Sequence, residues 1–323
     1  MTPSKSAVKI AILDDYQNVA LQMADWTPLR GRADITVVND HLDDPEAVVA
    51  RLEPFDIVCV MRERTPLPRR ILERLPRLKL IASTAYRNAS IDVEAAREHG
   101  IAVAHTSYDS TPTIELTWAL ILASARHVAV ENASFRARRW QRTIGSDLKG
   151  KTLGVLGLGN IGREVARIGL AFGMRVIAWS ENLTTEKATS VGAEHVQKTE
   201  LFGQADVLTI HLVLSRRSRG LVGPAELAQM KPSAWLVNTS RGPIVDESAL
   251  ISALRDHRIA GAAVDVFDIE PLPSDHPFRS LENMLATPHI GYVSENLYRR
   301  FYGDTVRNIV AWLDGSPLPT AGA

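Results

Sequence analysis

The sequence predicts an α/β protein built from two doubly wound, parallel-sheet (Rossmann-like) domains, the first of them discontinuous. Short apolar runs alternate with amphipathic helical patterns along the 323 residues, as parallel βαβ units require. The alternation forms two series, one over residues 1–104 and one centred on Gly157. A last helical pattern at 295–313 has no strand after it. We therefore expect this helix to cross back to the first domain.

The first series contains five strand-like runs separated by helical patterns, which makes parallel pairing the expectation. The single cysteine, Cys59, lies inside the third run, where we expect a buried thiol without an internal disulfide. This fits the reducing cytoplasm, where we expect the protein to act. The strand-like runs are 8–13, 35–38, 57–60, 78–82 and 101–104, and the helical patterns are 17–28, 45–52, 68–75 and 93–99.

A long helical pattern opens at Pro112, since proline is favoured at the first helical position. The apolar stretch 114–130 within it is interrupted by charged residues, so we interpret it as a buried helix and not as a membrane span. The basic stretch 136–140 is interpreted as a solvated face.

A complete βαβ unit covers residues 151–180 and carries the turn GLGNIG at 157–162. Glycines at this spacing allow a tight turn, the approach of a pyrophosphate to the backbone, and close packing of helix on strand. The pyrophosphate then lies against unpaired N–H groups at the helix N-terminus. The unit predicts dinucleotide binding. The residues expected to contact the cofactor here are Gly157, Gly159, Asn160, Ile161 and Gly162.

The end of the second strand of this unit bears on the choice of cofactor. The strand is followed by Ser180 and Glu181, and a carboxylate here accepts hydrogen bonds from the ribose 2′-OH and repels a 2′-phosphate. No lysine or arginine follows until Lys187. We expect NAD, with NADP possible because Ser180 accommodates either cofactor. In the alternative, Glu181 is only a surface carboxylate.

Further strand-like runs at 207–212, 234–238, 262–266 and 284–287 continue the second series. Arg241, Glu270 and His289 each follow one of the last three runs. Ligands bind beyond the carboxyl ends of parallel strands, so we expect these three side chains to converge. Carbonyl reduction needs a proton donor such as histidine, a carboxylate that favours the imidazolium, and a guanidinium for a substrate carboxylate. Taken singly, each residue has another interpretation: His289 as a turn histidine, Glu270 as a loop charge and Arg241 as a surface cation.

These stretches resemble those of the D-isomer-specific 2-hydroxyacid dehydrogenases, which include D-phosphoglycerate dehydrogenase, formate dehydrogenase and glyoxylate/hydroxypyruvate reductase. The resemblance implies an NAD(P)-dependent oxidoreductase that interconverts a 2-oxo acid and a D-2-hydroxy acid by hydride transfer. The matching stretches are 112–126, GLGNIGREVA at 157–166, VNTSRGPIVDESAL at 237–250, AAVDVFDIEPLP at 262–273 and TPHIGY at 287–292.

The resemblance also implies residue roles. Arg241 would bind the substrate, His289 would donate and accept the proton, and Glu270 would be its carboxylate partner. Asp265 would contact the nicotinamide carboxamide. The other residues implied to line the cofactor cleft are His211, Leu212, Thr239 and Gly291.

The family fold implies a flavodoxin-like substrate (catalytic) domain, residues 1–104 plus 292–323, around a dinucleotide-binding Rossmann domain, residues 105–291. It also implies a homodimer formed through the cofactor domains.

One segment departs from the family pattern. The family has a glycine-rich loop, just before an Asn-Ile-Asp, whose N–H groups receive the substrate carboxylate. Here residues 83–92 read STAYRNASID, with Ala85 and Arg87 in place of the usual glycines and Tyr86 at an apolar position. We expect Tyr86 and Arg87 to bind substrate, and hypothesise that Arg87 meets a distal anionic or polar group. In the alternative, Arg87 points to solvent.

Composition narrows the remaining function classes. Lysine plus arginine equals aspartate plus glutamate, 37 each, so nothing in the net charge favours nucleic acid or an anionic membrane. We expect a small-molecule substrate, no metal, no nucleic-acid or membrane partner, and no signal peptide in the N-terminal segment. A corepressor-like, nucleotide-sensing protein without turnover is the alternative. The intact set of Arg241, Glu270 and His289 argues against it.

Overall fold

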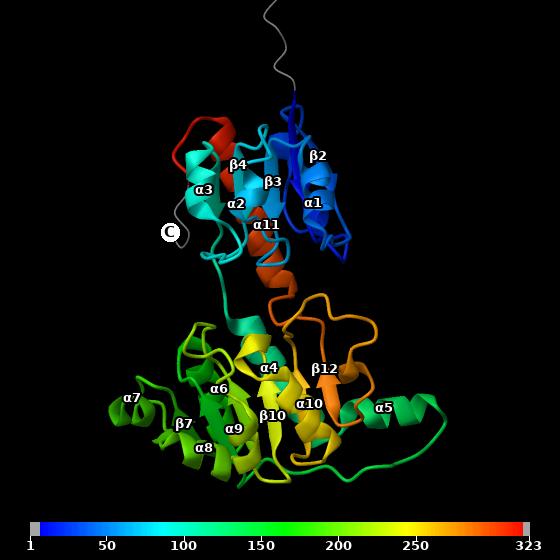
Figure 1. Cartoon of the computed structure of the whole chain (residues 1–323), viewed down its shortest axis with the longest axis vertical. Coiled ribbons are helices and arrows are strands. Elements are labelled where there is room, and N and C mark those ends of the chain that lie inside the picture. Colours follow the sequence, from blue (N-terminus) through cyan, green and yellow to red (C-terminus); the bar gives the residue numbers. More distant parts are fainter. Residues whose placement is uncertain (1–6, 319–323) are drawn as a thin grey trace, which may run out of the picture. The chain divides into compact units, whose positions relative to one another are not determined.

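The computed structural model describes residues 7–318; the first six residues of the segment expected to lack a signal peptide lie outside this range. The chain divides into two compact units. Unit 1 holds the residues up to Asp109 and those from Val293 on, and unit 2 is Ser110–Tyr292 (Figure 1). Each unit contains one parallel sheet with helices packed on it, which confirms the expected fold class with a discontinuous first unit.

Unit 1 has five strands in the order β2-β1-β3-β4-β5, the doubly wound order known from flavodoxin. Apolar residues of three helices form one core with one face of the sheet. The strands are β1 (Val8–Ile12), β2 (Ala33–Val37), β3 (Ile57–Val60), β4 (Leu80–Ser83) and β5 (Ala102–His105), and the three helices are α1 (Pro45–Leu52), α2 (Arg69–Leu72) and α3 (Val93–Glu98).

The last helix, α11 (Glu295–Leu313), packs on β4 and β5 of unit 1, as its missing strand partner predicts (Figure 1). Its polar side chains bind the last residue of β5 and the chain just after it. The Asp304 carboxylate accepts from the N–H of Ser107 at 2.8 Å, and Asn308 donates to the carbonyl of His105 at 3.0 Å. The C-terminal helix is therefore part of the first unit.

The prediction of a helix at 17–28 is wrong. The segment forms two short 3-10 turns, η1 (Ala20–Gln22) and η2 (Thr27–Leu29). The buried carboxylate of Asp15 accepts from the N–H groups of Val19 and Ala20 and fixes the first turn. Asn18, at φ +54°, interrupts any regular helix there. These tertiary and backbone features override the local helical pattern.

Unit 2 has seven parallel strands in the order β12-β11-β10-β9-β6-β7-β8. The six strands from β11 to β8 follow the 3-2-1-4-5-6 order of dinucleotide-binding folds, which β12 extends. The order reverses between β6 and β9, where such sheets open a ligand crevice at the carboxyl ends of the strands. The strands are β6 (Thr152–Leu156), β7 (Arg175–Trp179), β8 (Glu194–His195), β9 (Val207–Ile210), β10 (Trp235–Asn238), β11 (Gly261–Val264) and β12 (Met284–Ala286).

Helices cover both faces of this sheet. One face packs with α4 (Thr111–Ala125), α6 (Asn160–Ala171) and α7 (Thr185–Thr189), which share one apolar cluster. The opposite face packs with α8 (Lys198–Gln204), α9 (Pro224–Gln229) and α10 (Glu247–Arg255). The sheet is thus buried on both sides, as its continuous apolar strands require.

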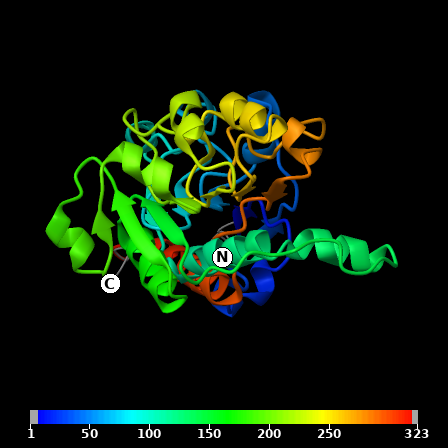
Figure 2. The same cartoon turned by 90° about the horizontal axis from the view of Figure 1, so that it is seen from below.

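A short helix that the sequence did not predict, α5 (Val128–Arg136), follows α4 after a 65° bend at His127. It and the chain after it extend away from the rest of unit 2 (Figures 1 and 2). The projection closes where the N–H of Ser146 donates to the carbonyl of Ala125 at 2.7 Å. We call residues 128–145 the arm.

No single helix within residues 7–318 is long and apolar enough to cross a membrane; only the bent pair α4 and α5 meets the length and composition requirement when taken together.

Candidate active site

The glycine turn after β6 has the geometry of a dinucleotide-binding loop. Gly157 adopts φ +100°, and a Cβ added to it would lie 2.8 Å from the carbonyl oxygen of His211. A Cβ on Gly162 would lie 2.0 Å from the carbonyl oxygen of Gly157. A Cβ on Gly159 would meet no atom within 4 Å. Gly157 and Gly162 are therefore needed by the fold, whereas Gly159 faces open space.

The N-terminus of the helix after this turn is suited to bind an anion. Gly159 is the N-cap of α6, so no side chain accepts from the first N–H groups, and the first turn holds no acidic residue. Unsatisfied N–H groups and the helix dipole together favour a phosphate at this position. The arrangement fits the pyrophosphate of a dinucleotide, with Asn160 and Ile161 in the first turn.

Ser180 and Glu181 directly follow β7, where the sequence predicts them. Glu181 is exposed, and its carboxylate forms an ion pair with Arg217 at 3.1 Å. No local pattern around Glu181 indicates this cation, because Arg217 belongs to the loop after β9. The fold brings the two loops together at the edge of the expected cofactor site.

The chain after β9 supplies the residues expected along the cofactor cleft. Burial lowers the pKa of His211 to about 3, so its ring is neutral, and it hydrogen-bonds Thr209 at 2.9 Å. The carbonyl of Leu212 accepts a hydrogen bond from the hydroxyl of Ser240. The loops after β9 and β10 are thereby joined next to the glycine turn.

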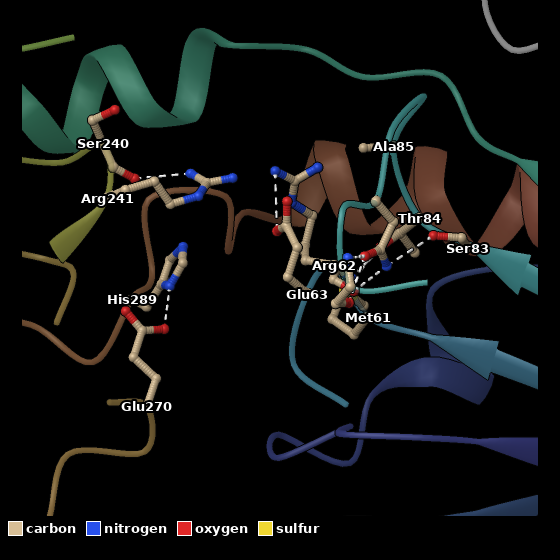
Figure 3. Close-up of polar contacts among 12 residues, drawn as sticks. Met61, Arg62, Glu63, Ser83, Thr84, Ala85, Ser240, Arg241, Glu270 and His289 are labelled. Atoms are coloured by element: carbon tan, nitrogen blue, oxygen red, sulfur yellow. Dashed lines mark hydrogen bonds and ion pairs between the residues drawn. The ribbon is translucent and has the colours of Figure 1, made fainter. Parts of the chain in front are cut away.

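His289 and Glu270, from the loops after β12 and β11, form a close pair (Figure 3). Nδ1 of His289 lies 2.5 Å from Oε2 of Glu270, and both side chains are about four-fifths buried, at 17% and 21% exposed. The second carboxylate oxygen, Oε1, accepts from the N–H of Phe267 at 2.9 Å. Both oxygens of Glu270 are therefore held, and the imidazole is oriented through Nδ1.

Asp265 fixes the loop that carries His289. Asp265 is 1% exposed, and its carboxylate accepts three hydrogen bonds, from the hydroxyl of Thr287 at 2.6 Å and from the N–H groups of Ile290 and Gly291 at 2.8 and 2.7 Å. Burial raises the pKa of Asp265, although these hydrogen bonds oppose the shift. The sequence identified Asp265 only through the family resemblance, as a contact for nicotinamide. Its structural position anchors the histidine loop.

Arg241 lies in a fixed turn after β10. The side chain of the buried Asn238 accepts from the N–H of Ser240 and donates to the carbonyl of Arg241, each at 3.0 Å. A Cβ on Gly242 would lie 2.1 Å from the carbonyl carbon of Phe267. The turn of Arg241 is thus packed against the segment that leads to Glu270. The guanidinium donates to the carbonyl of Ser240 at 2.8 Å (Figure 3).

The helix α4 braces this edge of the sheet from one side. The hydroxyl of Thr117 hydrogen-bonds that of Thr239 at 2.8 Å, and the hydroxyl of Thr113 donates to the carbonyl of Gly291 at 3.0 Å. The strands β10, β11 and β12 are adjacent and parallel, so the loops of Arg241, Glu270 and His289 leave the same edge. The three predicted residues therefore come from neighbouring strand ends of unit 2.

The segment that departs from the family pattern lies after β4 in unit 1. Ala85 adopts φ +65°, the region that glycine favours, and its N–H donates to the hydroxyl of Thr106 at 2.7 Å. Tyr86 is 56% exposed, and the guanidinium of Arg87 lies 5.9 Å from its ring centre. The turn keeps the glycine-type backbone at Ala85 and presents two large side chains.

A residue that sequence reasoning missed lies near this segment. Arg62, after β3, adopts φ +54°; its N–H donates to Thr84 at 2.7 Å and its carbonyl accepts from Asn88 at 2.5 Å (Figure 3). Its guanidinium lies 5.3 Å from the ring centre of Tyr108. Its position just past the third strand-like run was the signal that could have identified it.

No group of three or more histidine, cysteine, aspartate or glutamate side chains that could hold a metal occurs within residues 7–318.

Comparisons with known proteins place these features in a family context. Residues 118–291 match the family profile described as "D-isomer specific 2-hydroxyacid dehydrogenase, NAD binding domain". A glyoxylate reductase of Aeropyrum pernix is 42% identical over 259 residues, 77% of this chain and 77% of that protein. A hydroxypyruvate reductase of Thermotoga maritima is 36% identical over 287 residues, 87% and 92% of the two proteins. The structure of a phosphoglycerate oxidoreductase from Vibrio cholerae O395 matches with a TM-score of 0.91 and 39% identity, covering 96% of this chain and all of that one.

Proposed function

Because this chain belongs to the D-isomer-specific 2-hydroxyacid dehydrogenases, an oxidoreductase family with an NAD-binding domain, we propose that it interconverts a 2-oxo acid and a D-2-hydroxy acid, with His289 as acid and base. The observation that carries the proposal is the His289–Glu270 pair, at 2.5 Å, on neighbouring strand ends of the nucleotide-binding unit. A proton donor held by a carboxylate is what carbonyl reduction needs at this place.

When bound to unit 2, NADH would supply the hydride for the reduction and NAD would accept it in the oxidation. His289 protonates the carbonyl oxygen through Nε2, the ring nitrogen opposite the one that contacts Glu270. The carboxylate of Glu270 stabilises the imidazolium before transfer. Arg241 holds the substrate carboxylate and polarises the adjacent carbonyl. In the oxidation, His289 takes up the hydroxyl proton through Nε2.

The cofactor roles belong to the same proposal. The first turn of α6 receives the pyrophosphate beside Gly159, and Glu181 accepts from the adenosine ribose, which makes NAD the main cofactor. Asp265 would hold the carboxamide of nicotinamide through the one carboxylate lone pair that the histidine loop does not use.

The substrate is a small 2-oxo acid, as the names of the glyoxylate and hydroxypyruvate reductases among the relatives suggest. The N–H groups of Tyr86 and Arg87 receive substrate, and the guanidinium of Arg87 meets a second anionic or polar group on it. The exposure of both side chains on the segment after β4 supports this part of the proposal.

The direct test is an absorbance screen at about 340 nm, where reduced nicotinamide absorbs, of 2-oxo acids with NADH and with NADPH. We expect oxidation of the cofactor with at least one short 2-oxo acid. Cofactor binding without turnover of any 2-oxo acid would instead support a nucleotide-sensing binding protein, which neither the His289–Glu270 pair nor the named relatives favour.

We also propose a homodimer formed through unit 2, in the cytoplasm. Four large apolar side chains of the arm are more than half exposed, at 53% to 94%, and such a surface on a projecting segment is usually covered by a partner. The exposed residues are Val128, Phe135, Trp140 and Ile144.

Light scattering tests the dimer. The wild type is expected at twice the chain mass of 35.5 kDa, and the double variant Phe135→Asp/Trp140→Asp at the mass of one chain. A monomeric wild type would overturn the assignment.

A further inference from the structure

We propose that Arg217 sets the preference between NAD and NADP by acting on Glu181 at the adenosine end of the cofactor site. The observation is the ion pair between Nη1 of Arg217 and Oε2 of Glu181, at 3.1 Å. The inference rests on the proposed function only for the binding of a dinucleotide by unit 2. It does not depend on the substrate or on catalysis.

The loop that carries Arg217 is fixed at its base. The buried hydroxyl of Ser218 accepts from the N–H of Ser215 at 2.8 Å and donates to the carbonyl of Val213 at 2.7 Å. The N–H of Gly220 donates to the carbonyl of Pro243 at 2.8 Å. A turn bound on both sides presents the intervening arginine reproducibly, and its side chain is exposed.

The position of Glu181 gives the ion pair its chemical meaning. Glu181 is the second residue after β7, the second strand of the dinucleotide fold, and a carboxylate close after this strand accepts from the 2′-OH of NAD. The same carboxylate alone repels the 2′-phosphate of NADP. The positive charge of Arg217 beside Glu181 makes this end of the site locally neutral. The repulsion between the carboxylate and the 2′-phosphate is thereby offset.

Arg217 also offers a direct ligand for phosphate. A guanidinium matches phosphate oxygens with two parallel N–H donors. The pair with Glu181 is exposed on both sides, at 70% and 61% of the side chains, and exposed ion pairs are weak. Arg217 can therefore exchange the carboxylate for a phosphate at small cost. With NADP it turns to the 2′-phosphate beside Ser180; with NAD it stays on Glu181.

The test measures cofactor binding without substrate, by the fluorescence of NADH and of NADPH. Arg216 provides a matched control, since it is the exposed neighbour of Arg217 on the same turn. Arg217→Ala is expected to weaken NADPH about tenfold more than NADH, through loss of a charge-assisted contact. Arg216→Ala removes the same charge from the same loop and is expected to shift that ratio by less than about twofold, as screened exposed charges do.

A second variant tests the other partner. Glu181→Gln is expected to raise the affinity for NADPH relative to NADH, because the repulsion is lost and Arg217 is released. In the double variant Glu181→Gln/Arg217→Ala most of this gain should disappear. Circular dichroism and the unfolding midpoint confirm that each variant is folded.

Equal losses for both cofactors in Arg217→Ala, or an equal change in ratio with Arg216→Ala, would overturn the proposal. Failure to turn over any 2-oxo acid, with cofactor binding retained, would sink the proposed reaction and leave this inference standing. The two failures are thereby distinguishable.

Discussion

Glu270 contacts Nδ1 of His289 with one carboxylate oxygen and the N–H of Phe267 with the other. The carboxylate is therefore positioned by the backbone just after β11, and it positions in turn a ring on the loop after β12. An imidazole oriented in this way keeps Nε2 in one direction without substrate, as the proposed proton donor requires. This preorganisation is the basis of the first two expected outcomes.

Glu270→Gln should lower kcat about 10- to 100-fold, because the amide keeps the size of the side chain but no longer stabilises the imidazolium. NADH affinity should change little, since Glu270 is assigned to the histidine and not to the cofactor. Steady-state rates and fluorescence titration measure the two quantities. A kcat within a factor of about two of the wild type would contradict the assigned partnership.

His289→Ala should reduce turnover by about 10²- to 10⁴-fold, the usual contribution of a general acid. Binding of NADH in the absence of substrate should remain near the wild-type value. Exposed His257, replaced by Asn, serves as the control histidine. Near-normal turnover of His289→Ala would refute its role as acid and base.

Asp265→Asn should loosen the loop at 287–291. The two carboxylate oxygens accept from three donors, whereas an amide has only one acceptor oxygen. A buried N–H or hydroxyl left without a partner costs about 1 to 3 kcal/mol of unfolding free energy. Urea unfolding measures this loss, and kcat should fall with it because the loop carries His289. An unchanged unfolding free energy would show that the three hydrogen bonds are not needed to hold the loop.

Stability should depend on pH through His41, whose pKa is raised by its hydrogen bond to Asp14 at 3.1 Å. A raised folded-state pKa contributes stability that is fully present below the unfolded value of about 6.5 and is lost as pH rises through the folded pKa. Unit 1 should thus unfold more easily above neutral pH than at pH 6. The variant His41→Asn should show a flatter profile over this range, whereas the control His257→Asn should follow the wild type. Parallel profiles for all three proteins would rule out His41 as the source.

Arg87→Ala should lower kcat/KM about tenfold more for 2-oxo acids with a second carboxylate than for glyoxylate, because only the former lose a charge-assisted contact. Arg97→Ala, an exposed arginine on α3, is the control for general loss of positive charge from unit 1. Equal losses on both kinds of substrate would show that Arg87 faces solvent during the reaction.

Features that depend on neighbouring residues in the sequence were predictable. The apolar runs locate most strands within a few residues, and the bounds of α1 and α11 coincide with the predicted ranges. The glycine turn and the polar residues after β10, β11 and β12 follow from the same local patterns. Sheet order then brings these strand ends to one edge, which is a general property of parallel sheets.

Features that depend on contacts between distant segments were not predictable. Arg217 lies beside Glu181 because β9 and β7 flank β6, and no local pattern reports this. The left-handed backbone of Ala85 is imposed by its surroundings, since alanine alone disfavours it. The sequence pattern over α4 and α5 is that of one helix, and the bend at His127 divides it into two.

Replacing the three glycines of the turn after β6 would have different effects on folding and on ligand binding. At Gly157 and Gly162 an added methyl group collides with the protein's own backbone, so a change there damages the fold itself. Gly159 has an ordinary φ of −79° and empty space around it, so a change there obstructs only what binds. A related protein that has lost nucleotide binding but kept this fold is therefore expected to carry a larger side chain at position 159.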